Sequence, residues 1–289
     1  MKILVIGNGF IGASIIQKLE SDGHELLVFS KSYKSELKCR QLTGDIFLFE
    51  EFERVLSWKP QIIIHTAWIT AHAQYVEDSS NYKYSEFTSD LANYISHTDV
   101  EQLIILGTCA EYGPRTMAST AGITELNPIS LYAKQKVAAF NSAKNSLHSS
   151  NVRFTWARIF QPYGPHQDRK RLLPYLIDSI REGRQLDLKD TSTVLDWITT
   201  RDIASAISWI VNFGAPLEVD IGTSLGFTNL EILEHLEGLI GESHQAIRFA
   251  QHTPTSNQVI LVGKDSPLFR SGWLPQDSLD SGLKWILQS

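Results

Sequence analysis

Residues 2–12 read KILVIGNGFIG, and this stretch decides the fold. The apolar run over residues 2–6 predicts a buried strand, and a Gly-x-Gly-x-x-Gly pattern then leads into residues that recur at helical spacing. In such a loop Gly7 makes the tight turn, Gly9 lets backbone N–H groups approach a pyrophosphate, and Gly12 lets the helix pack closely on the strand. Alone the pattern also fits an ordinary strand–helix turn, but its strand–loop–helix context favours a dinucleotide site.

Strand and helix patterns go on alternating through the first half of the chain. Four further short apolar runs are typical of buried strands, and a helical pattern precedes the last of them. The strand candidates are residues 24–29, 61–65, 103–106 and 152–159, and the helix candidate is residues 131–147. Strand, helix and strand in this order predict a parallel, doubly wound sheet, so the expected fold class is Rossmann-type α/β.

After about residue 160 the pattern loosens, which predicts a second and smaller unit. Helical patterns alternate there with strand candidates near residues 193–198 and 217–221. We expect residues 1–160 to form the NAD(P)-binding Rossmann domain. Residues 161–289 are expected to form mainly a smaller C-terminal α/β substrate lobe, with crossings back to the first domain at about residues 193–222.

Composition limits the partners and the compartment. The chain of 289 residues has a formal net charge of −6, which leaves no electrostatic footprint for nucleic acid. No apolar run approaches the roughly 18 residues of a membrane span, and the glycines interrupt the first run too early for a signal peptide. Its two cysteines, Cys39 and Cys109, lie far apart and have no metal-ligand spacing. We therefore expect a soluble, cytoplasmic enzyme with no metal site and no disulfide framework.

The end of the second strand candidate bears on which dinucleotide binds. NAD sites usually place Asp or Glu there to bind the ribose 2′-hydroxyl. Here Ser30 and Lys31 occupy the strand end, and no acidic residue follows before Glu36. Ser30 and Lys31 suit a 2′-phosphate, so NADP is expected over NAD, with a solvated turn as the alternative. Asp45 is a candidate for a hydrogen bond to adenine, or alternatively the N-cap of the helix that contains Phe52.

Tyr132 and Lys136 form the clearest catalytic pattern. Ser130 is an N-cap candidate, so these two residues lie one turn apart on one helix face. A lysine there can lower the pKa of the phenol and suit it for proton transfer near neutral pH. Thr108 ends a buried strand candidate, where catalytic groups of parallel sheets gather, and can donate a hydrogen bond to a carbonyl. The alternative for Tyr132 and Lys136 is an exposed pair on a solvent or dimer face. The alternative for Thr108 is a hydroxyl that only caps the turn after the strand.

With these motifs in order, the chain resembles the extended short-chain dehydrogenase/reductases, the NAD(P)-dependent epimerase/dehydratase family of the nucleotide-sugar-modifying type. The resemblance is collinear over nearly the whole chain and rests on segments on both sides of the Tyr–Lys pair. These segments are residues 7–12, 44–45, 64–67, 106–113, 132–136, 158–165, 196–202 and 221–223.

The resemblance implies a role for each matching residue. Thr108 polarises the substrate carbonyl, Tyr132 is the general acid/base, and Lys136 modulates its pKa and contacts the nicotinamide ribose. The remaining cofactor-binding residues implied are Gly7, Gly9, Phe10, Ile11, Gly12, Ser30, Lys31, Asp45 and Ala67.

The family's substrates are mostly nucleoside-diphosphate sugars held by the C-terminal lobe. On this chain, Thr108, Cys109, Gln161, Arg169 and Arg171 are the implied substrate-binding residues. The resemblance also implies a homodimer, in which the Tyr–Lys helix and the helix around residues 84–95 form an intermolecular four-helix bundle. The Tyr–Lys helix carries more apolar residues than one core face needs.

Several positions depart from the family pattern. Leu195 stands where an arginine often holds the diphosphate, and Tyr84 stands where an asparagine is expected. The cluster Arg169–Arg171 is therefore the candidate replacement for the diphosphate contact. Cys109 and Ala110 occupy the positions of the Asp-Glu pair of sugar 4,6-dehydratases, which argues against dehydration.

Together these residues predict NADP(H)-dependent reduction of a keto group on a nucleotide sugar, of the 4-ketoreductase type, by a Thr/Tyr/Lys triad. One alternative is a nucleotide-sugar epimerase that keeps NAD tightly bound. The other is a dinucleotide-binding regulatory protein without turnover.

Overall fold

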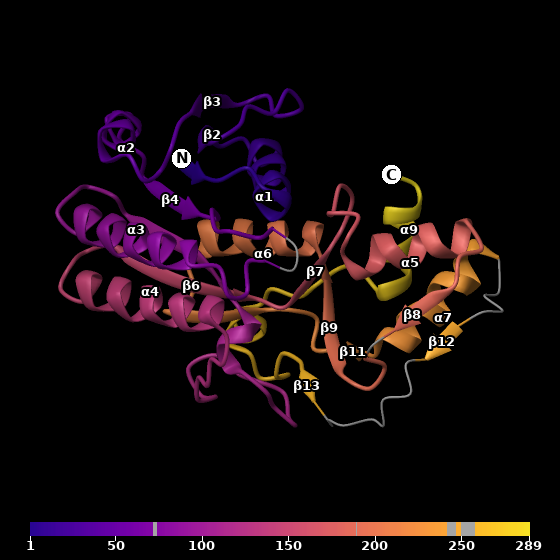
Figure 1. Ribbon diagram of the computed structural model, residues 1–289. Helices are drawn as coiled ribbons and strands as arrows, with labels where there is room; N and C mark the ends of the chain where they lie inside the picture. The colour runs from indigo at the N-terminus through magenta and orange to yellow at the C-terminus, as the bar shows by residue number, and fades with distance from the viewer. Residues whose placement is uncertain (72–73, 189, 242–246, 250–257) are drawn as a thin grey trace.

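A seven-stranded, wholly parallel sheet forms the centre of the molecule (Figure 1). The computed structural model describes residues 1–289 except 72–73, 189, 242–246 and 250–257. The strand order is β10-β6-β5-β4-β1-β2-β3. The strands are β1 (Lys2–Ile6), β2 (Glu25–Ser30), β3 (Arg40–Thr43), β4 (Ile62–His65), β5 (Gln102–Thr108), β6 (Arg153–Ile159) and β10 (Glu218–Ile221).

Helices cover both faces of this sheet (Figure 1). One face packs against α1 (Phe10–Ser21) and α6 (Thr200–Phe213), and the other packs against three helices. These three are α2 (Phe49–Leu56), α3 (Ser80–Ile95) and α4 (Leu131–Leu147). Successive residues of β1 point to opposite cores, which is why the strand is apolar throughout rather than alternating. The predicted Rossmann-type α/β class is confirmed.

A smaller α/β lobe lies beside the carboxyl ends of the central strands (Figure 1). It has its own core and two small sheets, with strand orders β11-β9-β13, to which β7 adds on β9, and β12-β8. Its strands are β7 (Gln161–Tyr163), β8 (Leu186–Leu188), β9 (Val194–Thr199), β11 (Gly226–Phe227), β12 (Ile247–Phe249) and β13 (Val259–Ile260). Its helices are α5 (Leu172–Arg181), α7 (Asn229–Ile240) and α9 (Leu279–Leu287), whereas α8 (Pro267–Arg270) packs against β10 of the central sheet.

Residues 193–222 connect the small lobe with the central sheet. β9 belongs to the small lobe, whereas α6 then packs against α1 and β10 pairs with β6 at the edge of the central sheet. The chain therefore passes from the lobe back to the central sheet within this segment. The division of the chain at residue 160 stays a prediction.

The carboxyl ends of β1, β4, β5 and β6 meet at one edge of the sheet, which places the segments that follow them side by side. One of these segments, η1 (Cys109–Tyr112), is a single 3₁₀ turn after β5. Within the part of the chain that the structure describes, no helix is long and apolar enough to span a membrane. Over the same residues, no group of three or more His, Cys, Asp and Glu side chains is placed to hold a metal ion.

Candidate active site

The loop between β1 and α1 has the geometry of a pyrophosphate cradle. Gly7 has a φ of +100°, and a Cβ on it would lie 2.7 Å from Thr66 Oγ1 and 2.9 Å from the Ala67 nitrogen. A Cβ on Gly12 would lie 2.5 Å from the Gly7 carbonyl oxygen. A Cβ on Gly9, in contrast, would meet no atom of the described residues within 4 Å. Two glycines thus permit close packing, and the third leaves open space beside the loop.

The first turn of α1 suits an anion. Gly9 is its N-cap and has no side chain to satisfy the N–H groups of the first turn, which contains Phe10 and Ile11. The first turn also has no acidic residue. The unpaired N–H groups and the helix dipole together favour a phosphate group at this position, so the residues present fit a dinucleotide.

The strand end that bears on cofactor choice is at Ser30. Ser30 is almost fully buried and its hydroxyl donates to the Ser32 carbonyl at 2.8 Å. Lys31 is exposed, with its Nζ 3.9 Å from Asp45 Oδ2 and 5.4 Å from the centroid of the Phe47 ring. The Lys31 ammonium is thus held loosely at the edge of the loop, beside the residue expected to contact adenine.

Asp45 does not cap α2. This helix begins at Phe49 with Leu48 as its N-cap, so the alternative assignment of Asp45 as a helix cap is wrong. Instead Asp45 Oδ1 accepts the N–H of Phe47 at 3.1 Å, and the Asp45 N–H donates to Glu51 Oε2 at 2.7 Å. The short turn between β3 and α2 explains the difference, since it lets Asp45 bond its own loop.

The Tyr–Lys pair of α4 faces the interior. The Ser130 hydroxyl accepts the Ala133 N–H at 3.2 Å, as the predicted N-cap requires, and α4 begins at Leu131. Lys136 is almost fully buried, and its Nζ donates to the Leu106 carbonyl at 2.7 Å. The alternative of an exposed Tyr–Lys pair is therefore wrong.

Thr108 ends β5 close to this pair. Its hydroxyl accepts the Ala110 N–H at 3.3 Å, so Thr108 does cap the turn that follows. Its side chain also interacts with the Tyr132 phenol, and this interaction works to lower the pKa of Tyr132. The structure thus brings Thr108, Tyr132 and Lys136 together, and the capping function of Thr108 coexists with its contact to the phenol.

Burial dominates the titration of both α4 side chains. It raises the pKa of Tyr132 well above the usual value of tyrosine, against the lowering expected from a neighbouring lysine. The physical reason is that burial takes the phenolate form of Tyr132 out of water, which disfavours its charge. Burial also lowers the pKa of Lys136 to about 7, which the Glu111 carboxylate partly opposes.

An aromatic wall, formed by Trp68, Tyr75 and Tyr84, lies beside Tyr132, which Trp68 and Tyr75 contact directly. The Trp68 ring lies 3.8 Å from Lys136 Nζ, stacks on Tyr84 at 5.5 Å and meets Tyr132 edge-on at 6.4 Å. Tyr75 meets Tyr132 edge-on at 5.0 Å. The sequence analysis missed Trp68, although its place directly after the His-Thr-Ala segment at the end of β4 was a usable signal.

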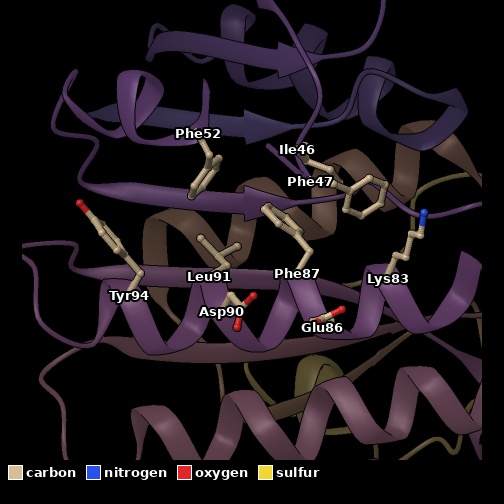
Figure 2. A pocket seen from close by; sticks show the side chains of 9 residues that line it. All are labelled: Ile46, Phe47, Phe52, Lys83, Glu86, Phe87, Asp90, Leu91 and Tyr94. Carbon is tan, nitrogen blue, oxygen red and sulfur yellow. The ribbon is translucent and has the colours of Figure 1, made fainter. Parts of the chain in front are cut away.

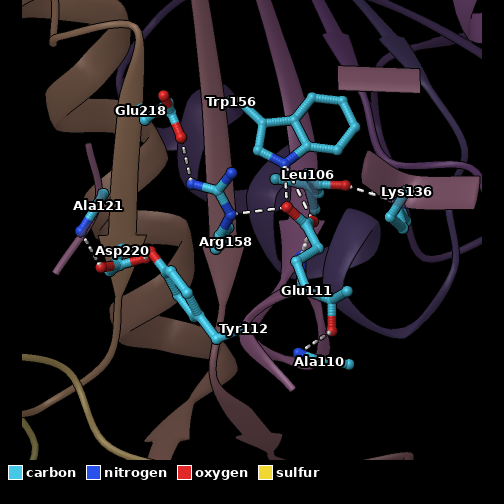
Figure 3. Close-up of polar contacts among 11 residues, drawn as sticks. Leu106, Ala110, Glu111, Tyr112, Ala121, Lys136, Trp156, Arg158, Glu218 and Asp220 are labelled. Carbon is cyan, nitrogen blue, oxygen red and sulfur yellow. Dashed lines mark hydrogen bonds and ion pairs between the residues drawn. The ribbon is translucent and has the colours of Figure 1, made fainter. Parts of the chain in front are cut away.

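A buried carboxylate lies behind Thr108. Glu111 is fully buried and bonds to Trp156 and Arg158 of the neighbouring strand β6, as Figure 3 shows. Glu111 lies within the segment 106–113 on which the family resemblance rests, but the sequence assigned it no function. Glu111 and Arg158 are 47 positions apart in the sequence, and no local pattern signals a contact over such a separation.

The implied substrate residues lie at different distances from this centre. Cys109 directly follows Thr108, and burial raises the pKa of its thiol to about 12. Gln161 lies in β7, paired with Trp197 of β9. Arg171 Nη2 donates to the Thr70 carbonyl at 3.1 Å, and its guanidinium lies 5.3 Å from the Tyr75 ring of the aromatic wall.

Arg169 points elsewhere. Its side chain is 84% exposed and lies 3.3 Å from Asp178 on α5. Of the two arginines expected at the substrate, the structure therefore brings Arg171 to the aromatic wall and does not bring Arg169 there.

A pocket of about 350 Å³ opens between α2 and α3 (Figure 2). Phe52, Phe87 and Leu91 line it with apolar surface, and Glu86 and Asp90 add carboxylates. Because it contains neither Thr108 nor the Tyr–Lys pair, we do not assign it to the reaction.

The glycine loop, the helix N-terminus and the Thr–Tyr–Lys cluster at one sheet edge define a dinucleotide-dependent α/β enzyme. Comparison with known families agrees: residues 3–222 match the model of the NAD dependent epimerase/dehydratase family. The chain belongs to this family, which confirms the resemblance found in the sequence.

Individual relatives are distant but cover most of the chain. A UDP-glucose 4-epimerase of Rhizobium meliloti (strain 1021) is 24% identical over 306 residues, covering 96% of this chain and 93% of the relative. Among solved structures, the NAD complex of UDP-glucose 4-epimerase from Thermus thermophilus has a TM-score of 0.87 at 23% identity, covering 100% of this chain and 98% of that one. UDP-glucose 4-epimerase from Thermotoga maritima, solved with UDP-glucose, has a TM-score of 0.86 at 22% identity, with the same coverage. These structures share the fold of this chain.

Proposed function

We propose that this protein is an NADP(H)-dependent reductase of the 4-keto group of a nucleotide sugar. The observation that carries the proposal is the arrangement around Tyr132, a half-buried side chain that packs edge-on against Trp68 and Tyr75 near Thr108. Burial raises the pKa of its phenol. Reduction of a carbonyl needs a proton donor at its oxygen, whereas oxidation of an alcohol needs a base there. A phenol that holds its proton at neutral pH suits reduction.

The chain's own groups divide the work at the carbonyl oxygen. Thr108 donates a hydrogen bond to this oxygen, since its hydroxyl oxygen accepts the Ala110 N–H and leaves the O–H free to donate. Tyr132 transfers its phenolic proton to the same oxygen as charge develops on it. Lys136 places a positive charge behind the phenol, which stabilises the phenolate that remains. The nicotinamide, when bound, supplies the hydride.

Cofactor choice rests on the end of β2. A 2′-phosphate placed there meets the buried Ser30 and the exposed Lys31 ammonium, and no carboxylate belongs to the strand end itself. Asp45 lies 3.9 Å from Lys31 and is the acceptor proposed for adenine. Because an acidic residue at the strand end would repel the phosphate, its replacement by Ser and Lys favours NADP.

A 4-epimerase that keeps NAD bound is the second candidate. The relatives named above favour it, since all three are UDP-glucose 4-epimerases and one was solved with NAD. Dehydration is not proposed, because Cys109 and Ala110 replace the acidic pair. A regulatory protein without turnover is disfavoured because Thr108, Tyr132 and Lys136 are all placed at the end of β5.

We propose Arg171 as the contact to the diphosphate of the substrate, since its guanidinium lies at the aromatic wall.

We also propose a homodimer built from α3 and α4, which pack together along their length. Size-exclusion chromatography with light scattering at micromolar concentration tests the dimer, and a monomeric mass would refute it.

Cofactor accounting tests the proposed reaction. Purified protein is incubated with NADPH and, separately, UDP- and dTDP-linked 4-keto sugars, and the nicotinamide absorbance is followed. A reductase consumes one NADPH for each sugar reduced. Interconversion of UDP-glucose and UDP-galactose with no net NADPH loss, together with NAD carried through purification, would establish the epimerase instead.

A further inference from the structure

The ion pair between Glu111 and Arg158 is wholly buried. Glu111 Oε2 lies 2.6 Å from Arg158 Nε, and both side chains have no exposed surface. Arg158 Nη1 also lies 2.8 Å from Glu218 Oε2, whose side chain is 18% exposed (Figure 3). Burying such a pair costs desolvation that its attraction often fails to repay, so stability is a weak explanation for it.

Glu111 is bonded directly to the backbone of a catalytic candidate. Its Oε1 accepts the Thr108 N–H at 2.8 Å, while the Thr108 hydroxyl accepts the Ala110 N–H. These reciprocal bonds form a capping box that fixes how the chain turns at the end of β5. The position of the Thr108 hydroxyl therefore depends on the Glu111 carboxylate.

The strand leaves room for this contact. A Cβ on Gly107 would lie 2.7 Å from Glu111 Oε1 and 2.2 Å from Trp156 Nε1. Only a residue without a Cβ lets both side chains approach the strand so closely. Gly107 thus belongs to the arrangement around Glu111 rather than to a turn.

Trp156 connects the carboxylate to Lys136. Its Nε1 donates to both oxygens of Glu111, at 3.0 and 3.1 Å, and its ring lies 5.8 Å from Lys136 Nζ. Lys136 Nζ bonds to the Leu106 carbonyl, two residues before Thr108 (Figure 3). The Lys136 ammonium and the Glu111 carboxylate are thus both bonded to the backbone at the carboxyl end of β5.

Other polar groups that face Lys136 do not balance its charge. His65, at the end of β4, stays neutral, because burial and the lysine lower its pKa to about 3. Tyr132, on α4 itself, keeps its proton because its pKa is raised. Arg158, on β6, is a cation beyond the carboxylate. Trp68 contributes only its ring face. Glu111 is the carboxylate that raises the pKa of Lys136 against the lowering caused by burial.

We propose that Glu111 is a positioning residue of the active site, which fixes the backbone of Thr108 and supplies the buried negative charge that balances the Lys136 ammonium. Its importance for turnover rests on the proposed function of the Thr–Tyr–Lys cluster. Its effect on Lys136 does not, because the charge of a lysine can be measured without substrate.

The direct test compares Glu111→Gln with Glu218→Gln by NMR of protein labelled with ¹³C at lysine Cε, with the Lys136 signal assigned from Lys136→Met. Both variants remove a carboxylate from Arg158, but only the first removes the carboxylate that bonds to Thr108 and whose charge acts on Lys136. We expect the Lys136 ammonium to titrate about one pH unit or more lower in Glu111→Gln. In Glu218→Gln it should titrate close to wild type. An unchanged Lys136 titration in Glu111→Gln would overturn the proposal.

Folding is checked by thermal melting. If Glu111→Gln does not fold, the double variant Glu111→Gln/Arg158→Met replaces it, because removing both partners of a buried pair avoids an uncompensated charge. A smaller downward shift of the Lys136 titration is expected there, because removing the Arg158 cation partly offsets the loss of the nearer carboxylate, and an unshifted titration would overturn the proposal.

Turnover with NADPH and the keto sugars gives the second readout. The alkaline limb of the pH–rate profile should move to lower pH in Glu111→Gln, and Glu111→Asp, which keeps the charge, should restore the wild-type limb. A profile that falls uniformly at every pH in both variants would show a merely structural function. If wild-type protein turns over none of these sugars, the proposed function fails, whereas the NMR result still decides the function of Glu111.

Discussion

The two ends of the site are built in different ways. At the cofactor end, Gly7, Gly9 and Gly12 act through the backbone, because close approach, open space and unpaired N–H groups are the features that matter. At the catalytic end, side chains from distant segments are buried together and their charges change each other's titration. The first end depends on shape and the second on electrostatics, so substitutions at the two ends should fail in different ways.

The largest effect is expected at the catalytic end. Tyr132→Phe removes the proton donor while keeping the ring that packs against Tyr75 and Trp68, so the fold should persist. We expect the rate of carbonyl reduction to fall by about 10²- to 10⁴-fold with little change in NADPH binding. Steady-state kinetics and fluorescence titration measure the two quantities. Near-wild-type turnover would remove Tyr132 from the mechanism.

Acid should destabilise the catalytic end through His65. The folded-state pKa of His65 is lowered to about 3, from about 6.5 in the unfolded chain, so its contribution is complete above pH 6.5. It is lost as the pH falls from about 6.5 towards 3, at up to about 1.4 kcal/mol per pH unit.

Urea unfolding at several pH values measures this contribution. His65→Leu should have a shallower dependence of unfolding free energy on pH over this range, even if it is less stable at neutral pH. Identical slopes in wild type and variant would contradict the assignment.

Two glycine substitutions at the cofactor end should affect stability and cofactor binding separately. In Gly12→Ala the new methyl group meets the Gly7 carbonyl oxygen, so the free energy of unfolding should fall by about 1–3 kcal/mol. In Gly9→Ala it meets nothing in the described structure, and the backbone φ of −63° suits alanine, so stability should hardly change. NADPH binding should nevertheless weaken in Gly9→Ala. Equal stability loss in both variants would contradict the different functions given to the two glycines.

The smallest effect concerns cofactor choice. Lys31→Ala should raise the dissociation constant for NADPH by about tenfold or more, because a charge-assisted bond contributes about 1.5–3 kcal/mol and Lys31 is partly solvated. NADH binding should hardly change. Lys34→Ala is the matched control, since Lys34 lies in the same loop and pairs with Glu36 at 3.9 Å. An unchanged ratio of NADPH to NADH affinity in Lys31→Ala would end the NADP assignment.

The sequence predicted what depends on neighbouring residues. The bounds of α4 at Leu131 and Leu147 agree with the prediction, because its N-cap and apolar spacing are local signals. β3 was missed, since an edge strand that is half exposed, with Arg40 and Gln41, has no apolar run. The bond between Glu111 and Arg158 joins two segments far apart in the chain, and no spacing along the chain reports it.

The raised pKa of Tyr132 was missed for a similar reason. A lysine four residues away predicted a lowered value, but the structure bonds that lysine to the Leu106 carbonyl and packs Trp68 and Tyr75 against Tyr132. Burial by residues from other segments therefore outweighs the local pattern. The candidate site could be located from sequence, whereas its electrostatics required the assembled fold.

Transfer of deuterium from labelled NADPH tests the central claim most directly. NADPH carrying deuterium at the transferable position of the nicotinamide is incubated with protein and the 4-keto sugar nucleotide, and the product is analysed by mass spectrometry and NMR. The account predicts one deuterium on the reduced carbon of each product molecule and an equal loss of NADPH. Sugar isomers that form without deuterium, while the labelled NADPH remains intact, would contradict it.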